Sequence, residues 1–296
     1  MNNLNGILLV IASMAAFTLE DMFIKRLSGE IPVGQILIML GIGSGSVFAC
    51  MALIKGENLF PRQAWRGVVL LRSGAEAFGA MAFATALSLV DISTVAAVFQ
   101  ALPLVITMGA ALFLGEQVGW RRWSAIAVGF AGVMLIVRPG GAEFDPNVFW
   151  ALLAVVALGG RDLAVRQVPR SVPHILLAVY GFTAVVPVGL VQLSITGGAI
   201  WPDTYLWTLI GGAVAVGVTA YYLLVSATRI GDVAVITPFR YSRLVFALCV
   251  GILVFGERPD LATYAGAALI IGSGIYTFVR ERRLARRMDA VDPTLV

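Results

Sequence analysis

The sequence predicts an all-α integral membrane protein with ten transmembrane helices, and three observations carry this prediction. Hydrophobic residues make up 59% of the 296 residues and charged residues only 13%, about half the charged share of a soluble domain. The mean hydropathy is +0.91. Ten apolar runs are each long enough to cross a hydrocarbon core about 30 Å thick. These runs are continuously apolar rather than alternating, which excludes a β-barrel.

Glycines, prolines and charge clusters mark where each run ends. The first run follows Met1 without the basic leader of a cleavable signal peptide. The longest connection, 55–66, leaves no room for a soluble catalytic domain between the spans. In chain order, we expect spans at 4–24, 33–54, 67–89, 93–114, 122–138, 147–168, 173–195, 205–226, 233–255 and 261–280.

The loop charges predict an orientation. Ten spans place both termini on one side of the membrane. If that side is the cytoplasm, the cytoplasmic ends carry 13 Lys and Arg residues and the opposite ends carry 4. Cytoplasmic loops are enriched in Lys and Arg, so we expect an N-in, C-in arrangement. The net charge of +4 reflects this topology and not nucleic-acid binding.

The chain repeats itself. Asp91 and Glu116 are separated by 25 positions, Asp232 and Glu257 are separated by 25 as well, and the two copies lie 141 positions apart. Each half therefore holds five spans, and because five is odd the second half enters the membrane inverted. Inverted repeats are typical of secondary transporters; the alternative is a stable bundle of a channel or membrane enzyme. The predicted units are 1–140, 141–280 and a cytoplasmic tail, 281–296.

Ionisable side chains inside spans are costly and therefore mark function. Arg72 and Glu76 lie four residues apart on one helix face, which favours a local ion pair over substrate or proton contact. Arg240 and Arg243 share a face and need anions. The candidates are Glu20, Asp21 and Asp162 of the protein, or a carboxylate or phosphate of the substrate. The full set of four acids and four bases is Glu20, Asp21, Arg72, Glu76, Arg161, Asp162, Arg240 and Arg243.

Two acids in the first span differ in depth. We expect Asp21 to form an interfacial pair with Lys25 and Arg26, whereas the deeper Glu20 is a candidate coupling site. Arg161 and Asp162 are candidates for coupling or for a snorkelling interfacial pair. Pro103 and Pro238 interrupt the fourth and ninth spans, which suits a bend or a ligand contact.

Aromatic and amide side chains complete the predicted substrate site. The offset of 141 places Phe99 and Gln100 on Arg240 and Tyr241, so the two pairs are expected to face each other. The alternatives are lipid-facing aromatics and a helix–helix hydrogen bond for Gln100. The predicted substrate-binding residues are Phe78, Phe99, Gln100, Tyr221, Arg240, Tyr241 and Arg243.

Other features bear on packing and chemistry. Small residues, including Gly132 and Gly266, predict close helix packing between the fifth and tenth spans, with an oligomer contact as the alternative. A single histidine, two cysteines within apolar runs and no nucleotide-binding motif leave no catalytic residues, metal site or cofactor to propose. A membrane-embedded enzyme is the remote alternative.

Two segments resemble a known family. "ALSLVDISTVAAVFQALPLVITMGAALFLGEQ" and "GDVAVITPFRYSRLVFALCVGILVFGERPD" look like the two EamA repeats of the drug/metabolite transporter superfamily. The resemblance implies a ten-helix, 5+5 carrier of a small metabolite in the cell inner membrane, working by alternating access. The opening 29 residues and the second segment resemble the riboflavin-transporter branch. This implies riboflavin uptake, with amino-acid or S-adenosylmethionine transport or export as the alternative.

Overall fold

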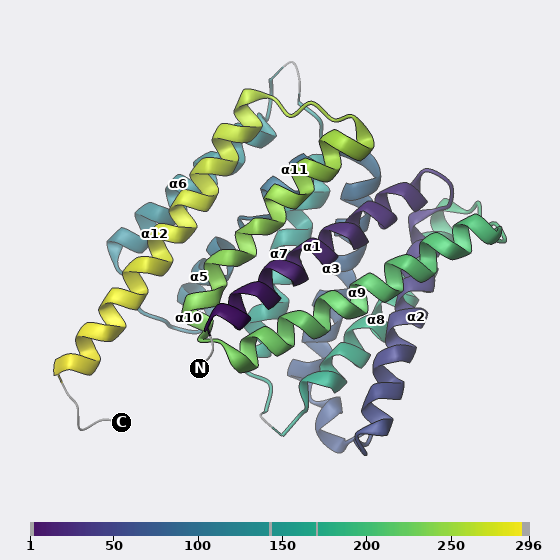
Figure 1. Cartoon of the computed structure of the whole chain (residues 1–296), viewed down its shortest axis with the longest axis horizontal. Coiled ribbons are helices and arrows are strands. Elements are labelled where there is room, and N and C mark those ends of the chain that lie inside the picture. The colour runs from purple at the N-terminus through teal and green to yellow at the C-terminus, as the bar shows by residue number, and fades with distance from the viewer. Residues whose placement is uncertain (1–2, 142–143, 170, 292–296) are drawn as a thin grey trace.

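The computed structural model is an all-helical bundle that describes residues 3–141, 144–169 and 171–291 (Figure 1). The first half contains α1 (Asn3–Ser28), α2 (Val33–Ile54), the 3₁₀ turn η1 (Arg62–Trp65), α3 (Gly67–Leu89), α4 (Ile92–Phe99), α5 (Leu102–Phe113) and α6 (Trp120–Val137). The second half contains α7 (Val148–Val165), α8 (His174–Thr196), α9 (Thr204–Ile230), α10 (Val233–Ile236), the 3₁₀ turn η2 (Thr237–Tyr241), α11 (Ser242–Phe255) and α12 (Leu261–Val291).

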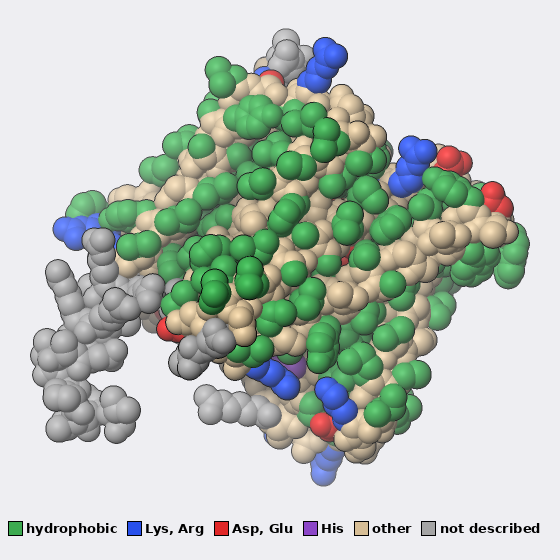
Figure 2. Space-filling view, in the orientation of Figure 1, with side chains coloured by type: hydrophobic (Ala, Val, Ile, Leu, Met, Phe, Trp, Pro, Cys, Tyr) green, Lys and Arg blue, Asp and Glu red, His purple; other side chains and the backbone are tan. Residues whose placement is uncertain are grey.

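The ten predicted spans are confirmed. Within the described ranges, ten helical segments are long and apolar enough to cross a membrane. Figure 2 shows hydrophobic side chains spread across the middle of one face, with charged side chains near its periphery. Helix α12 continues beyond 280 to Val291, through most of the predicted tail; the last five residues of that tail lie outside the described ones.

The helices pair mainly between the two halves. Helix α1 packs along α9, α3 along α7, α2 against α8 and α6 against α12 (Figure 1). The 141-residue offset relates α1 to α7 and α3 to α9, so the α1–α9 and α3–α7 pairs are equivalent. Below, residues 141 positions apart are called repeat-related. Because the main helix pairs join the two halves, a rotation of one half against the other changes the contacts of the residues that lie between them.

One span in each half is discontinuous, and the two breaks are repeat-related. The fourth span breaks between α4 and α5 at Gln100–Ala101, and the ninth tightens into η2 just before α11. Pro103 occupies the start of α5, where its missing N–H costs nothing. Pro238 lies at the start of η2. Broken helices near the midplane are where carriers of this plan hold their substrates, so the breaks direct attention to the interior between the halves.

The predicted seam between the fifth and tenth spans is confirmed as a contact between α6 and α12. A β-carbon added to Gly132 would lie 2.7 Å from the carbonyl oxygen of Gly266. Both positions are therefore restricted to glycine by close backbone approach.

The substitution Gly132→Val is expected to separate α6 from α12 and lower stability by about 1–3 kcal/mol, the usual cost of overpacking. Thermal unfolding in detergent measures this effect. The matched control is Gly272→Ala on α12, because nothing lies within 4 Å of an added β-carbon there. Equal melting temperatures for both variants would contradict the seam.

Candidate functional site

One group of charges joins α3 to α7, and we call it the α3–α7 cluster. Glu76 is bound by two arginines, at 2.8 Å by Arg72 of its own helix and at 2.8 Å by Arg161 of α7. Arg161 also holds Asp162 at 2.8 Å. Arg72 donates to the carbonyl oxygen of Leu177 on α8 at 2.5 Å. The expected Arg72–Glu76 pair is confirmed, whereas Arg161 spans two helices instead of forming only a local interfacial pair.

A second group surrounds Arg243, and we call it the Arg243 cluster. Its guanidinium binds the buried Asp21 carboxylate at 2.7 and 2.9 Å. Three rings from different helices, Phe17, Phe83 and Phe99, have centroids 5.1–5.4 Å from the guanidinium carbon. Such stacking suits arginine. The interfacial role expected for Asp21 is wrong, because the side chain turns inward to this partner.

Arg240, on η2, is different because none of the described residues hydrogen-bonds or ion-pairs with its side chain. It is exposed, yet Asp162, Arg161 and Arg243 all lie within electrostatic range of it. Those neighbours belong to both clusters, so Arg240 lies near the charges that join the two halves. An arginine without an anion there is a ready partner for a carboxylate or phosphate.

Glu20 is the corresponding acid without a partner. Its half-buried carboxylate lies against Gly217 of α9, and the described residues supply it with neither a hydrogen bond nor an ion pair. The repeat gives the reason: Glu20 is repeat-related to Arg161, and Gly217 to Glu76. Where Arg161 pairs with Glu76 at one place, the repeat-related place therefore has the carboxyl group of Glu20 facing Gly217. Space and a carboxyl group remain where the mirrored site holds a pair of side chains.

The other predicted site residues lie at different places in the bundle, and not all of them are near the two clusters. Gln100 is buried at the α4–α5 break, and its side-chain amide has no hydrogen-bond partner among the described residues. Tyr221 contacts Phe48 edge-on and lies within electrostatic range of the α3–α7 cluster. Phe78 is exposed on α3. The Tyr241 hydroxyl is directed at Gly274 of α12. The facing of Phe99 and Gln100 with Arg240 and Tyr241, which the offset suggested, stays a prediction.

Comparison with known proteins agrees with this architecture. The model of the EamA-like transporter family matches twice, over residues 4–138 and 146–279. The chain belongs to the EamA-like transporter family. This EamA-like transporter is therefore a secondary transporter of a small metabolite, with many spans in a membrane, and not an enzyme.

The similar proteins include transporters named for different substrates. The transporter is 24% identical over 281 residues to an S-adenosylmethionine uptake transporter of Rickettsia prowazekii, covering 95% of this chain and 94% of the relative. It is 29% identical over 227 residues to a riboflavin transporter of Rhizobium johnstonii, covering 75% and 73%. A crystal structure shares the fold at a TM-score of 0.62 with 20% identity, covering 95% of this chain and 99% of that one.

Proposed function

We propose that this protein carries a small zwitterionic metabolite across the cell inner membrane by alternating access, in an N-in, C-in orientation. The observation that supports the proposal is the charge count between the halves. Of the eight intramembrane ionisable groups named above, all of them described, six are engaged in the two clusters. The remaining two, Glu20 and Arg240, are one acid and one base. The site therefore has room for one cationic group beside Glu20 and one anionic group beside Arg240.

The physical argument is one of desolvation. An ionised group removed from water is costly unless an opposite charge and hydrogen bonds replace the water. A bound carboxylate satisfies Arg240 through two parallel hydrogen bonds, the geometry that a guanidinium favours. A bound ammonium or sulfonium satisfies Glu20. A metabolite with both groups therefore supplies a partner to Glu20 and to Arg240 at once. The rings beside Arg243 offer an apolar surface for the rest of the molecule.

S-Adenosylmethionine is the first substrate to test. Its amino-acid end carries a carboxylate and an ammonium, its sulfur carries a positive charge, and its adenine is a flat ring that packs on apolar surface. The relative named for S-adenosylmethionine uptake aligns over nearly the whole chain. Amino acids present the same carboxylate and ammonium and form the neighbouring test class.

Riboflavin is the second candidate. The riboflavin transporter relative and the aromatic side chains near the helix breaks favour it. Being neutral, it would leave Glu20 and Arg240 uncompensated, which is why we place it after the zwitterion.

Uptake by purified protein in liposomes tests the proposal. We expect saturable uptake of labelled S-adenosylmethionine, recovered unmodified, and at least about tenfold slower uptake of methylthioadenosine, because that compound lacks the amino-acid end. Liposomes without protein are the control for leakage. Saturable riboflavin uptake with no zwitterion uptake would replace the first substrate by the second. Transport of neither would overturn the substrate proposal.

A further inference from the structure

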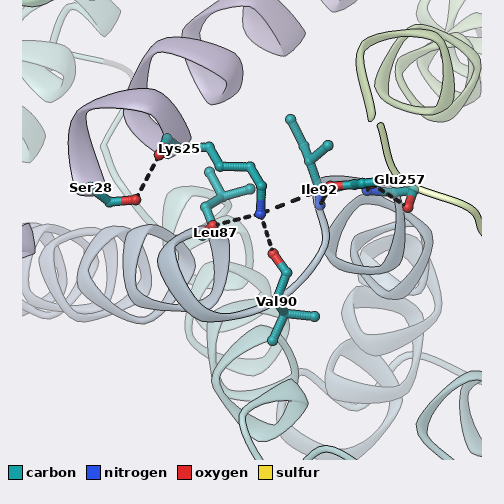
Figure 3. Close-up of polar contacts among 7 residues, drawn as sticks. Lys25, Ser28, Leu87, Val90, Ile92 and Glu257 are labelled. Atoms are coloured by element: carbon teal, nitrogen blue, oxygen red, sulfur yellow. Dashed lines mark hydrogen bonds and ion pairs between the residues drawn. The ribbon is translucent and has the colours of Figure 1, made fainter. Parts of the chain in front are cut away.

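Glu257, a buried acid outside the two clusters, joins the halves of the molecule. It lies in the loop between α11 and α12, and its carboxylate caps the start of α4 in the other half (Figure 3). It accepts from the backbone N–H of Ile92 at 2.7 Å, from that of Ser93 at 3.1 Å and from the Ser93 hydroxyl at 2.6 Å. A carboxylate suits this place because the first N–H groups of a helix lack partners within it.

Lys25 extends the same contact to two more helices. From the end of α1 its ammonium donates to the carbonyl oxygens of Leu87 at 3.2 Å and Val90 at 2.7 Å, at the end of α3 (Figure 3). It lies 3.9 Å from the Glu257 carboxylate. Four segments therefore meet at the end of the bundle where α1 finishes. We call Lys25, Glu257 and the start of α4 the closed latch.

The repeat places the same residue types at the opposite end. Glu116 is repeat-related to Glu257, and Arg166 to Lys25. The local turns agree closely: the preceding glycines have φ of +68° and +66°. The backbone N–H of each glutamate bonds to a repeat-related carbonyl, at 3.2 Å for Glu116 and 2.9 Å for Glu257. The backbone turn that carries each glutamate is therefore closely similar in the two halves, so a difference between their side chains is informative about how the halves are packed.

The difference is large. The Glu257 side chain is 4% exposed, whereas that of Glu116 is 45% exposed and, among the described residues, pairs with Arg166 alone, at 2.6 Å. A cavity of about 450 Å³ opens beside Arg166 and reaches Leu177, the residue whose carbonyl holds Arg72. One end of the bundle is thus closed over buried polar contacts, and the repeat-related end is open.

We infer that Glu257 and Glu116 are a pair of alternating positioning residues. Each caps the discontinuous span of the opposite half in one state and releases it in the other. The span capped here acts directly on the site, because α4 ends in Phe99, whose ring lies 5.1 Å from the Arg243 guanidinium. In the opposite state the start of the 233–255 span takes the Glu116 carboxylate, and the Glu257 cap opens. The inference rests on the proposed function only in that the site it controls is the transport site.

Spin-label distances across the two ends test the pair without any substrate. One pair of labels is placed on the exposed residues Glu30 and Arg258 at the closed end. The other is placed on the repeat-related Ser171 and Gln117 at the open end. The background carries Cys50→Ser and Cys249→Ser, since both cysteines are exposed.

With Glu257→Gln we expect the Glu30–Arg258 distance to lengthen and the Gln117–Ser171 distance to shorten. The reason is that opening the closed latch allows Glu116 to cap the start of the 233–255 span. Glu116→Gln is expected to leave both distances near those of the parent and to slow transport at least about tenfold, since the closing partner is lost. Arg62→Gln changes an exposed residue outside the closed latch, the Glu116–Arg166 pair and the cavity beside Arg166, and it is the control for both readouts.

A purely structural role for Glu257 predicts something else: its loss would broaden the Glu30–Arg258 distribution and leave the other end unchanged. That result, or no change at either end in a folded Glu257→Gln protein, overturns the inference. If Glu257→Gln fails to reach the membrane, Ser93→Ala removes one of the three bonds and is expected to shift both distances in the same directions by less. Because the distance measurements need no ligand, their outcome is separate from the choice of substrate.

Discussion

Replacing Arg240 by alanine is expected to lower transport by about a hundredfold, since truncating one partner of a desolvated charge pair costs about 2–5 kcal/mol. None of the described residues forms an ion pair with Arg240, and Asp162 keeps its own pair with Arg161, so the loss of Arg240 removes substrate affinity and leaves no protein carboxylate newly unpaired. We therefore expect unchanged expression and melting temperature. Initial rates of zwitterion uptake in liposomes measure the effect.

Two companions sharpen this expectation. Arg240→Lys retains the charge but loses the two-bond geometry, so we expect a smaller loss of about tenfold. Arg62→Ala removes an exposed arginine of η1 that lies outside the cavity beside Arg166, and it is expected to change the rate less than about twofold. Full transport by a correctly inserted Arg240→Ala protein would remove the guanidinium from the site.

Replacing Asp21 by asparagine is expected to destabilise the protein by about 3–5 kcal/mol, because Arg243 then remains buried without its anion. The carboxylate is 4% exposed and the arginine 15%, so water cannot take its place. Because the same guanidinium holds Phe17, Phe83 and Phe99, we also expect the site to loosen. Unfolding in detergent measures the cost.

A double-mutant cycle separates the pair from its surroundings. Asp21→Asn combined with Arg243→Met is expected to cost less than the two single changes together, since the orphaned charge disappears. The control is Arg138→Gln in the more exposed Arg138–Asp260 pair, for which about 0–1 kcal/mol is expected. A similarly small effect for Asp21→Asn would mean that the Arg243 cluster does not stabilise the fold.

The sequence predicts contacts within one helix better than contacts between helices. All ten spans and the Arg72–Glu76 pair follow from apolar run length and four-residue spacing, which are local properties. The choice of Asp21 as the partner of Arg243, over Glu20 and Asp162, depends on the tilt and rotation of α1 against α11. Residue spacing predicts neither the tilt nor the rotation, and it does not predict the direction in which Tyr241 points.

Some of what was missed does have a signal in the sequence. Applying the offset to every charged residue pairs Glu20 with Arg161 and Glu76 with Gly217, which marks where the halves differ in charge. The same comparison pairs Lys25 with Arg166. The offset does not predict how exposed each glutamate is: Glu116 and Glu257 lie in closely similar turns, yet only Glu257 is buried against the other half.

The central claim, that Glu20 and Arg240 hold the two ends of a zwitterion, is tested most directly by matching site variants with altered ligands. Inhibition of uptake by S-adenosylmethionine and by its decarboxylated analogue is compared in the parent protein and in Arg240→Gln and Glu20→Gln. We expect the parent and Glu20→Gln to prefer the carboxylate-bearing ligand at least about tenfold, and Arg240→Gln to lose that preference. A preference that survives unchanged in Arg240→Gln would contradict the claim.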